Sequence, residues 1–258
     1  GRVWRMYHFI EGTRTFTSPR SSAQATAAAR AFGEFQALLA DLPSPPLHET
    51  IPHFHDTPRR FAALRTSIAD DAHRRAANAA DEIAFCLARE ASAGLLTDLH
   101  RRGAIPQRIV HNDAKISNVL FDDAGREAIC VVDLDTVMPG LSLYDFGDMV
   151  RSMACSAAED ERDLSRVEVS PERFAALAAG YLEATGNLLV PAEREHLVDA
   201  ARIITLEQGV RFLTDYLDGD RYYQTKRLNH NLDRCRTQLK LVASIERQAA
   251  TLRRAASA

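Results

Sequence analysis

The sequence predicts a mainly helical α+β fold in which one small β-hairpin is embedded. Apolar residues recur at three- and four-residue spacing before residue 101 and again after residue 144, which is the period of amphipathic helices. Between residues 108 and 132 the pattern changes from helical to extended. The 258 residues are 46% apolar and 26% charged, so the chain has the composition and length of a globular protein with a sizeable core.

The first part of the chain predicts a strand followed by a helix. Residues 3–10 are rich in aromatic and branched side chains and Gly12 interrupts the run, so we expect a short strand and then a linker. Residues 18–41 follow the helical period, with Ser18 as the N-cap and Pro19 at the first helical position. The prolines at 43, 45 and 46 are expected to end this helix.

Two more helices are expected before residue 103. One begins at Pro58, and a long one spans residues 71–101 and stops at Gly103. The segment before Pro58 contains three histidines and an aspartate, which are His48, His53, His55 and Asp56. We expect an exposed, irregular loop there, because no second cluster supplies the remaining ligands of a closed zinc site.

The middle of the chain predicts the hairpin, and the remainder predicts helices. Residues 109–110, 118–121 and 128–132 form extended runs, and Gly125 suits the turn between the last two. A helix is expected from Ser170, as N-cap, to Gly186. Two others are expected over residues 191–217 and 229–254.

The net charge, the apolar runs and the cysteine spacing indicate which partners and which cellular compartment to expect. With 32 basic and 35 acidic residues the net charge is −3, so no basic field favours nucleic acid as the partner. The sequence contains neither a signal peptide nor an apolar run of about 18 residues, so we expect a cytoplasmic protein without a membrane span. The four cysteines form no Cys-x-x-Cys pair and are expected to be reduced and mostly buried; they are Cys86, Cys130, Cys155 and Cys235.

The chain is organised around residues 111–148, HNDAKISNVLFDDAGREAICVVDLDTVMPGLSLYDFGD. Phosphoryl transfer needs an aspartate that orients the attacking hydroxyl, and an asparagine and an aspartate that hold Mg²⁺ against the phosphates. Asp113, Asn118 and Asp133 have the order and spacing for these three roles. Lys115 follows Asp113 by two residues and could offset charge on the transferred group. Each residue alone would be an ordinary turn or cap residue, so the prediction rests on their joint spacing.

These motifs resemble the aminoglycoside phosphotransferase and choline-kinase superfamily of small-molecule kinases. More narrowly, HNDAKISNVLF, CVVDLDTVMPG and YDFGDMVR resemble sugar kinases that phosphorylate the anomeric hydroxyl of N-acetylhexosamines. RFLTDYLDGDRYY and NLDRCRTQLKLVASIE, in the last third, are similar to the same subgroup, so the resemblance covers residues 4–246. It implies a protein-kinase-like fold and the use of ATP and Mg²⁺. The superfamily motifs are specific, and the subgroup motifs are less so.

The resemblance also implies roles for single residues. Asp113 matches the catalytic base, and Asn118 and Asp133 match the metal ligands. Asp135 matches either a supporting carboxylate or a ligand of a second ion. Two substrate-binding positions are implied further on, Arg211 and Tyr222, although a salt bridge and simple packing are the respective alternatives.

Three residues around the loop are expected to have supporting roles. His111 is expected to hold the loop through backbone contacts. Asp145 and Asp148 are expected to cap the following helix and brace the loop.

The same resemblance divides the chain at residue 13. Residues 1–13 resemble the last strand of a kinase N-terminal lobe and the hinge, where Phe9, Ile10 and Glu11 would present backbone groups to the adenine. Residues 14–258 resemble the C-terminal catalytic lobe. Such a kinase also has a β-rich N-terminal lobe with a phosphate-covering loop and a lysine–glutamate pair, and the sequence contains none of these. We therefore expect a truncated chain with little or no kinase activity alone.

Other functions remain open at this point. The same fold could phosphorylate an aminoglycoside, choline or a homoserine-like alcohol, because the acidic cluster Asp215, Asp218 and Asp220 would suit a cationic acceptor. A non-catalytic pseudokinase lobe that retains a sugar site is a third hypothesis. A metal-dependent hydrolase using Asp133 and Asp135 lacks the Asp or His cluster that two bridged metals need.

Overall fold

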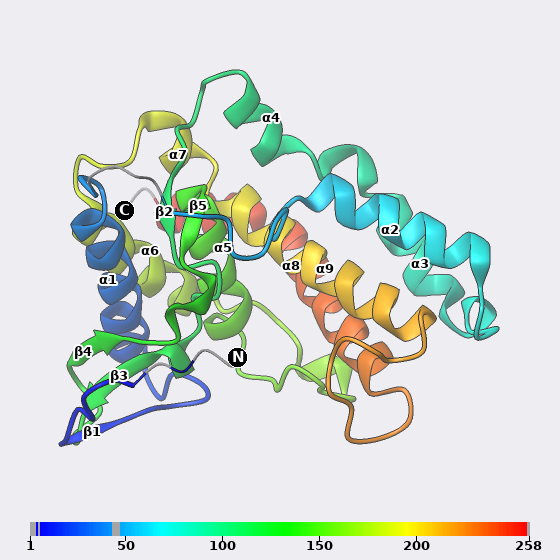
Figure 1. The fold of residues 1–258 in the computed structure, drawn as a ribbon, viewed down its shortest axis with the longest axis horizontal. Helices are drawn as coiled ribbons and strands as arrows, with labels where there is room; N and C mark the ends of the chain where they lie inside the picture. Colours follow the sequence, from blue (N-terminus) through cyan, green and yellow to red (C-terminus); the bar gives the residue numbers. More distant parts are fainter. Residues whose placement is uncertain (1–3, 5, 43–46, 257–258) are drawn as a thin grey trace.

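A computed structural model describes residues 4, 6–42 and 47–256 and shows a mainly helical α+β fold, as predicted (Figure 1). The helices of this part of the chain are α1 (Ser22–Leu38), α2 (Thr57–Asp70), α3 (Ala80–Leu87), α4 (Leu95–Arg101), α5 (Ser142–Met153), α6 (Pro171–Thr185), α7 (Pro191–Glu195), α8 (Leu197–Leu217) and α9 (His230–Ala256). The strands are β1 (Thr13–Arg14), β2 (Arg108–Val110), β3 (Val119–Asp122), β4 (Ala128–Val131) and β5 (Met138–Gly140). No helix among the described residues is long and apolar enough to cross a membrane.

The predicted hairpin is present. Strands β3 and β4 are antiparallel, with Val119 opposite Val131, and Gly125 makes the turn at a φ of +71°. Strand β1 adds to the other edge of β3, and β2 pairs with β5 in a second, two-stranded sheet. The sequence did not predict this second sheet as a pair, because strands of three residues are too short to show a period.

The helices pack around α5. Helix α1 lies along α6, α8 lies along α9, and α5 is between these two pairs (Figure 1). Helices α1 and α6 approach closely at Gly180, where an added Cβ would collide with the backbone oxygen of Thr26. One buried apolar cluster joins α1, α5 and α6, and a second joins α2, α8 and α9. The 111–118 loop and strand β2 lie against α5, whereas strand β4 of the hairpin lies against α1. Helix α5 therefore supports the loop.

The predicted strand over residues 3–10 is wrong for the residues that the structure describes. Residues 4 and 6–10 form no regular element, and the side chains of Trp4, Met6, Tyr7 and Phe9 are exposed. A strand needs a neighbouring backbone to accept its hydrogen bonds, and none of the described residues pairs with this segment. Pairing begins only at Thr13, opposite Asp122.

Some helix boundaries also differ from the prediction. Helix α1 begins later than expected, because Ser21, and not Ser18, accepts the capping bond from the backbone N–H of Gln24 at 3.2 Å. The predicted helix over 71–101 is broken into α3, α4 and short 3₁₀ turns. The break begins at Asp71, which has a φ of +33° and accepts bonds from the N–H groups of Arg75 and Ala76. The 191–217 helix breaks at His196 into α7 and α8.

Other predicted boundaries are confirmed. Ser170 caps α6, which ends before Gly186, and α2 begins beside Pro58 with Asp56 as its cap. Gly103 follows α4 at a φ of +73°. All four cysteines are free, and three of them are buried. The prolines expected to end the first helix lie outside the described residues.

Candidate functional site

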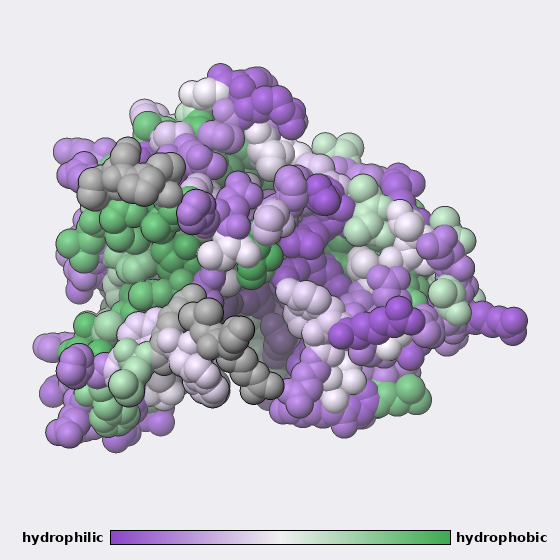
Figure 2. Space-filling view, in the orientation of Figure 1, coloured by the Kyte–Doolittle hydropathy of each residue, from purple (hydrophilic) through white to green (hydrophobic). Residues whose placement is uncertain are grey.

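The candidate site lies in a hollow between the hairpin side of the molecule and the α8–α9 side. The space-filling view shows hydrophilic residues lining this hollow near the middle of the face (Figure 2). The 111–118 loop runs from β2 to β3, so the hydrogen bonds of two sheets fix both of its ends. The polar residues predicted to carry chemistry belong to this loop and to the segment after β4.

Asp113 is held by two neighbours of its own loop. Its Oδ2 accepts from the Lys115 Nζ at 2.6 Å and from the Asn118 Nδ2 at 2.9 Å. Burial alone would raise the pKa of Asp113, but these two donors and the more distant Arg151 hold the pKa below its ordinary value. Asp113 is therefore an ionised carboxylate at neutral pH, able to accept a hydrogen bond from a hydroxyl.

His111 holds the loop through backbone contacts, as expected. Its Nε2 lies 2.9 Å from the carbonyl oxygen of Val132, and its Nδ1 accepts from the backbone N–H of Asp113 at 3.3 Å. These partners assign a neutral ring that carries its proton on Nε2. The N–H of Val132 also donates to the carbonyl of Asn118 at 2.9 Å. Val132 thus ties the loop to the residue before Asp133.

Asp145 braces the same loop from below. Its carboxylate accepts from the backbone N–H of His111 at 2.9 Å, from that of Asn112 at 2.7 Å, and from the Nε2 of Gln36 at 2.7 Å. Burial raises the pKa of Asp145, yet all three contacts are N–H donors, which favour the carboxylate. Its bracing role is confirmed. The expected capping role is wrong, because Leu141 occupies the N-cap of α5 and no side chain caps it.

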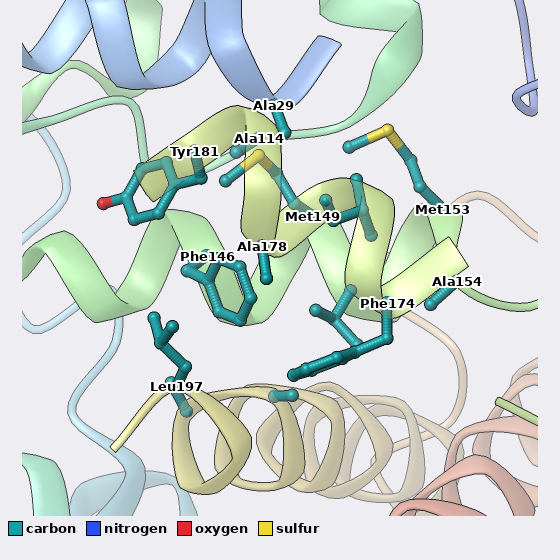
Figure 3. Close-up of a cluster of buried hydrophobic side chains, with 14 of the residues drawn as sticks. Ala29, Ala114, Phe146, Met149, Met153, Ala154, Phe174, Ala178, Tyr181 and Leu197 are labelled. Atoms are coloured by element: carbon teal, nitrogen blue, oxygen red, sulfur yellow. The ribbon is translucent and has the colours of Figure 1, made fainter. Parts of the chain in front are cut away.

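Apolar packing fixes the loop and its brace. Ala114, which follows Asp113, belongs to the buried cluster that contains Phe146 of α5 and Tyr181 of α6 (Figure 3). The Tyr181 hydroxyl donates to Gln36 Oε1 at 2.8 Å, so the amide of Gln36 is oriented with its nitrogen toward Asp145. The loop that carries Asp113 is consequently held in place by the buried core.

Asp148 does not cap the helix or touch the loop; it forms an ion pair with Arg151 at 2.6 Å. Arg151 also reaches Glu159 at 3.1 Å. Burial alone would lower the pKa of Arg151, and these two carboxylates raise it, so the guanidinium keeps its charge. Arg151 interacts electrostatically with both Asp113 and Tyr223. The sequence analysis missed this residue, although its i,i+3 spacing from Asp148 was a signal.

The residues predicted to hold a metal provide oxygen atoms on two adjoining segments. Asn118 ends the loop, and Asp133 follows Val132 with a φ of +64°. Within the part of the chain that the structure describes, the exposed Asp133 carboxylate makes no hydrogen bond or ion pair, and hard oxygen atoms suit Mg²⁺. Asp135 is exposed on the next 3₁₀ turn, where its carbonyl accepts from Thr50 at 3.0 Å.

A closed protein metal site is not formed. Among the described residues, no group of three or more His, Cys, Asp or Glu side chains could hold a metal ion. The oxygen atoms of Asn118 and Asp133 therefore fit a metal that takes its other ligands from phosphates and water.

The two predicted substrate residues line one cavity of about 180 Å³. Arg211 lies on α8 and Tyr222 on the following loop, and Arg60 of α2 completes the cavity on its opposite side. The Arg211 guanidinium stacks over the Phe54 ring at 4.9 Å and donates to Gln208 at 3.2 Å, and it forms no salt bridge with a carboxylate of the described residues. Tyr222 is 68% exposed and therefore available to a ligand.

Two residues of the acidic cluster, Asp215 and Asp218, also line this cavity, and most of the cluster is engaged in other contacts. Asp215 accepts from the backbone N–H groups of residues 221–223 at 2.8–3.0 Å and from the side chain of Asn231 at 2.8 Å. Asp220 forms an ion pair with Arg75 at 2.5 Å. Two of the three carboxylates thus fold the loop that carries Tyr222.

The histidine-containing segment before α2 differs from the prediction. His53 is exposed as expected, but His55 is only 7% exposed and contacts the buried Glu207 of α8. The isolated sequence could not reveal a partner 152 positions away. The three residues expected beside the adenine lie in the segment before β1, where Phe9 is 87% exposed and the Ile10 carbonyl accepts from Thr13 at 2.7 Å. Glu11 is exposed as well.

Comparison with known proteins gives a match to a family model and matches to solved structures. A family model described as "Phosphotransferase enzyme family" matches residues 1–195, which is more than half of the 258 residues. The crystal structure of a choline/ethanolamine kinase family protein from Mesorhizobium loti is similar to this chain, with 16% sequence identity and a TM-score of 0.46. That match covers 95% of this chain and 73% of the other.

Proposed function

The chain belongs to the phosphotransferase enzyme family, and we propose that it transfers the γ-phosphoryl group of ATP to a hydroxyl of a small molecule. The acceptor that we propose is an N-acetylhexosamine, phosphorylated at its anomeric hydroxyl. The observation that carries the phosphoryl-transfer proposal is the ionised Asp113, which shares a loop with Asn118 and is tied through Val132 to Asp133.

Asp113 acts mainly by orientation. Its carboxylate accepts a hydrogen bond from the acceptor hydroxyl and points the hydroxyl oxygen toward the γ-phosphate. Because phosphoryl transfer passes through a loose transition state, the proton moves late and a carboxylate of low pKa is sufficient. Lys115 is bonded to the same carboxylate, so its ammonium is placed to offset charge on the transferred group.

Asn118 and Asp133 would hold Mg²⁺, with Asp135 as a supporting carboxylate or a ligand of a second ion. When bound, the metal neutralises charge on the phosphates. The backbone of Phe9, Ile10 and Glu11 would contact the adenine of ATP. These assignments rest on the family resemblance and on the exposed oxygen of Asp133.

The cavity supports a neutral hydroxylated acceptor. Arg60 and Arg211 both line it, and burial together with the charge of Arg211 lowers the pKa of Arg60, so the two cations are close. Asp215 and Asp218 line the same cavity, but the Asp215 carboxylate already accepts from backbone N–H groups and a side-chain amide. The two guanidinium groups therefore outnumber the one exposed carboxylate of the described lining, Asp218, and disfavour a cationic acceptor such as choline or an aminoglycoside, because like charges repel. Arginine donors suit ring hydroxyls and the acetamido carbonyl of an N-acetylhexosamine, and the exposed Tyr222 ring offers a face to the sugar.

The proposal can be tested by turnover in the product of the complete reading frame that contains these 258 residues. We expect ATP-dependent phosphorylation of N-acetylglucosamine or N-acetylgalactosamine, and none of choline or kanamycin. Asp113→Asn should reduce kcat by about 10²–10⁴-fold and leave sugar binding within a factor of about two, because the base contributes to the transition state. Unchanged kcat would exclude Asp113 as the base, and turnover of the cationic alcohols alone would exclude the sugar.

Sugar binding by calorimetry separates the remaining alternative. A non-catalytic lobe would bind N-acetylhexosamine without turnover in the complete product, whereas the proposed enzyme both binds and phosphorylates it.

A further inference from the structure

His55 lies between two hydrogen-bond acceptors in the interior of the molecule. Its Nδ1 is 2.8 Å from Oε1 of Glu207, and its Nε2 is 3.1 Å from the carbonyl oxygen of Asn112. The side chains of His55 and Glu207 are 5% and 1% exposed, so water cannot replace either partner. Both bonds therefore depend on the protonation of the ring.

The partners of the ring assign its charge. A backbone carbonyl can only accept. The pKa of Glu207 is lowered although burial raises it, and Arg211 and the Thr57 hydroxyl contribute to this lowering independently of the charge of His55. Thr57 donates to the second oxygen of Glu207 at 2.6 Å, which also favours the carboxylate. A neutral imidazole has only one N–H, so satisfying both acceptors requires the doubly protonated imidazolium.

Asn112 is the residue before Asp113, and both its backbone N–H and its backbone carbonyl make hydrogen bonds. Its φ is +64°, its N–H donates to Asp145, and its side chain donates to the carbonyl of Thr136 at 3.0 Å. The remaining backbone group is the carbonyl, which belongs to the peptide that leads into Asp113. His55 donates to this carbonyl, and the N–H of the same peptide donates to Nδ1 of His111, so the two histidines hold the peptide from opposite edges.

We propose that the imidazolium of His55, paired with Glu207, is a positioning residue that sets the orientation of Asp113 through the Asn112 carbonyl. Glu207 precedes Arg211 by one turn of α8, so the same ion pair connects the helix that carries the acceptor cavity to the loop that carries the base. The kinetic part of this inference rests on the proposed phosphotransferase function. The charge of the ring does not.

The other groups near His55 are compatible with this charge. The ring of Tyr144, on α5, lies 5.0 Å from it, and burial raises the pKa of that hydroxyl, which stays neutral. Asp56 follows in the chain and interacts electrostatically with Tyr144. Arg211 and Arg60 are the nearby cations, and both interact electrostatically with Glu207. The Glu207 carboxylate, which contacts the ring directly, is the group that favours the imidazolium beside them.

The first test measures the charge directly and uses His111 as an internal control. In a two-bond ¹H–¹⁵N correlation spectrum of the ¹⁵N-labelled chain at neutral pH, His55 should show the pattern of an imidazolium. His111 should show the neutral ring with its proton on Nε2, as its partners require. A neutral His55 at neutral pH would overturn the proposal whether or not the protein is a kinase.

The second test separates positioning from structural support with two variants of opposite geometry. In His55→Asn the amide nitrogen replaces Nδ1 and keeps the bond to Glu207, whereas in His55→Gln it replaces Nε2 and keeps the bond to Asn112. We expect His55→Asn to lower kcat by roughly 10- to 100-fold in the complete product, because the base is misplaced, and His55→Gln to restore most of it. KM for the acceptor should change by less than about threefold in both.

His53→Asn is the matched control, since His53 is exposed and Asp56, at 3.6 Å, is the one ion-pair partner of its ring among the described residues. It should leave kcat unchanged. If kcat falls equally in His55→Asn and His55→Gln, at equal melting temperatures, His55 supports the structure and does not position Asp113. If both variants unfold, the ring charge in the unsubstituted chain decides. If the product of the complete reading frame is inactive, the proposed function is refuted. The ¹H–¹⁵N correlation spectrum would then still decide whether His55 is an imidazolium paired with Glu207.

Discussion

The carboxylate of Asp145 offers a direct measure of how strongly the fold holds the 111–118 loop. It accepts three N–H donors in a fully buried position, and Asp145→Asn preserves its shape while replacing one oxygen with an NH₂ group. Gln36 can turn its oxygen toward the new NH₂ group, because the Tyr181 hydroxyl can donate to the Ser142 carbonyl instead. The NH₂ group would still face one of the two backbone N–H groups of the loop. At least one buried donor must then face another donor.

The magnitude follows from these contacts. Losing one hydrogen bond to a buried carboxylate costs about 1.5–3 kcal/mol, and the donor left without a partner adds a desolvation penalty of about 1–3 kcal/mol. Removing the buried charge recovers part of this sum. We therefore expect Asp145→Asn to lower the free energy of unfolding by about 2–4 kcal/mol, a large part of the roughly 5–15 kcal/mol of an ordinary domain.

Chemical denaturation followed by circular dichroism measures this difference on the chain itself. Asp98→Asn is a suitable control, because Asp98 is half-exposed and pairs only with nearby Arg101, so its loss should change the free energy of unfolding by less than about 0.5 kcal/mol. A loss below about 1 kcal/mol for Asp145→Asn would show that the three bonds do not brace the loop.

Two further predictions concern pH. Lys115→Met removes the ammonium that lowers the pKa of Asp113, so the acid limb of the kcat–pH profile of the complete product should move to higher pH. Lys226→Met is the control and should leave this limb in place. If the limb does not move in Lys115→Met, Lys115 does not control the pKa of Asp113. The pKa of Glu207 is lower in the folded chain than its ordinary value of 4.5, so its contribution to stability is complete above that pH and is lost as the pH falls below it. The difference in free energy of unfolding between the unsubstituted chain and Glu207→Gln should therefore shrink below about pH 4.5, and a constant difference would contradict the ion pair.

Local patterns in the sequence predicted the parts of the site that are formed by neighbouring residues. The hairpin depends on a glycine turn and two short apolar runs, and it brings Asn118 and Asp133 together within 16 positions of sequence. The contact of Lys115 with Asp113 depends on a separation of two residues. Such features are determined by backbone geometry over a few residues, so spacing alone is informative.

Long-range polar contacts could not be predicted in the same way. Gln36 and Asp145 are 109 positions apart, and His55 and Glu207 are 152 apart. A buried glutamine or histidine has no periodic signature, and in an isolated sequence it resembles a residue on an exposed loop. The break after α2 was missed for a related reason, since Asp71 satisfies two backbone N–H groups with its side chain and so competes with the helix.

The low pKa of Asp113 and the buried polar contacts behind it have one physical explanation. A carboxylate whose pKa lies below its ordinary value is a poor proton acceptor, so its value to phosphoryl transfer must come from orientation. Orientation to within a fraction of an ångström requires a loop that cannot relax. That requirement accounts for the burial of charged groups at Asp145 and Glu207, which would otherwise cost stability, because each fixes a backbone group of the two residues before the base, directly or through His55.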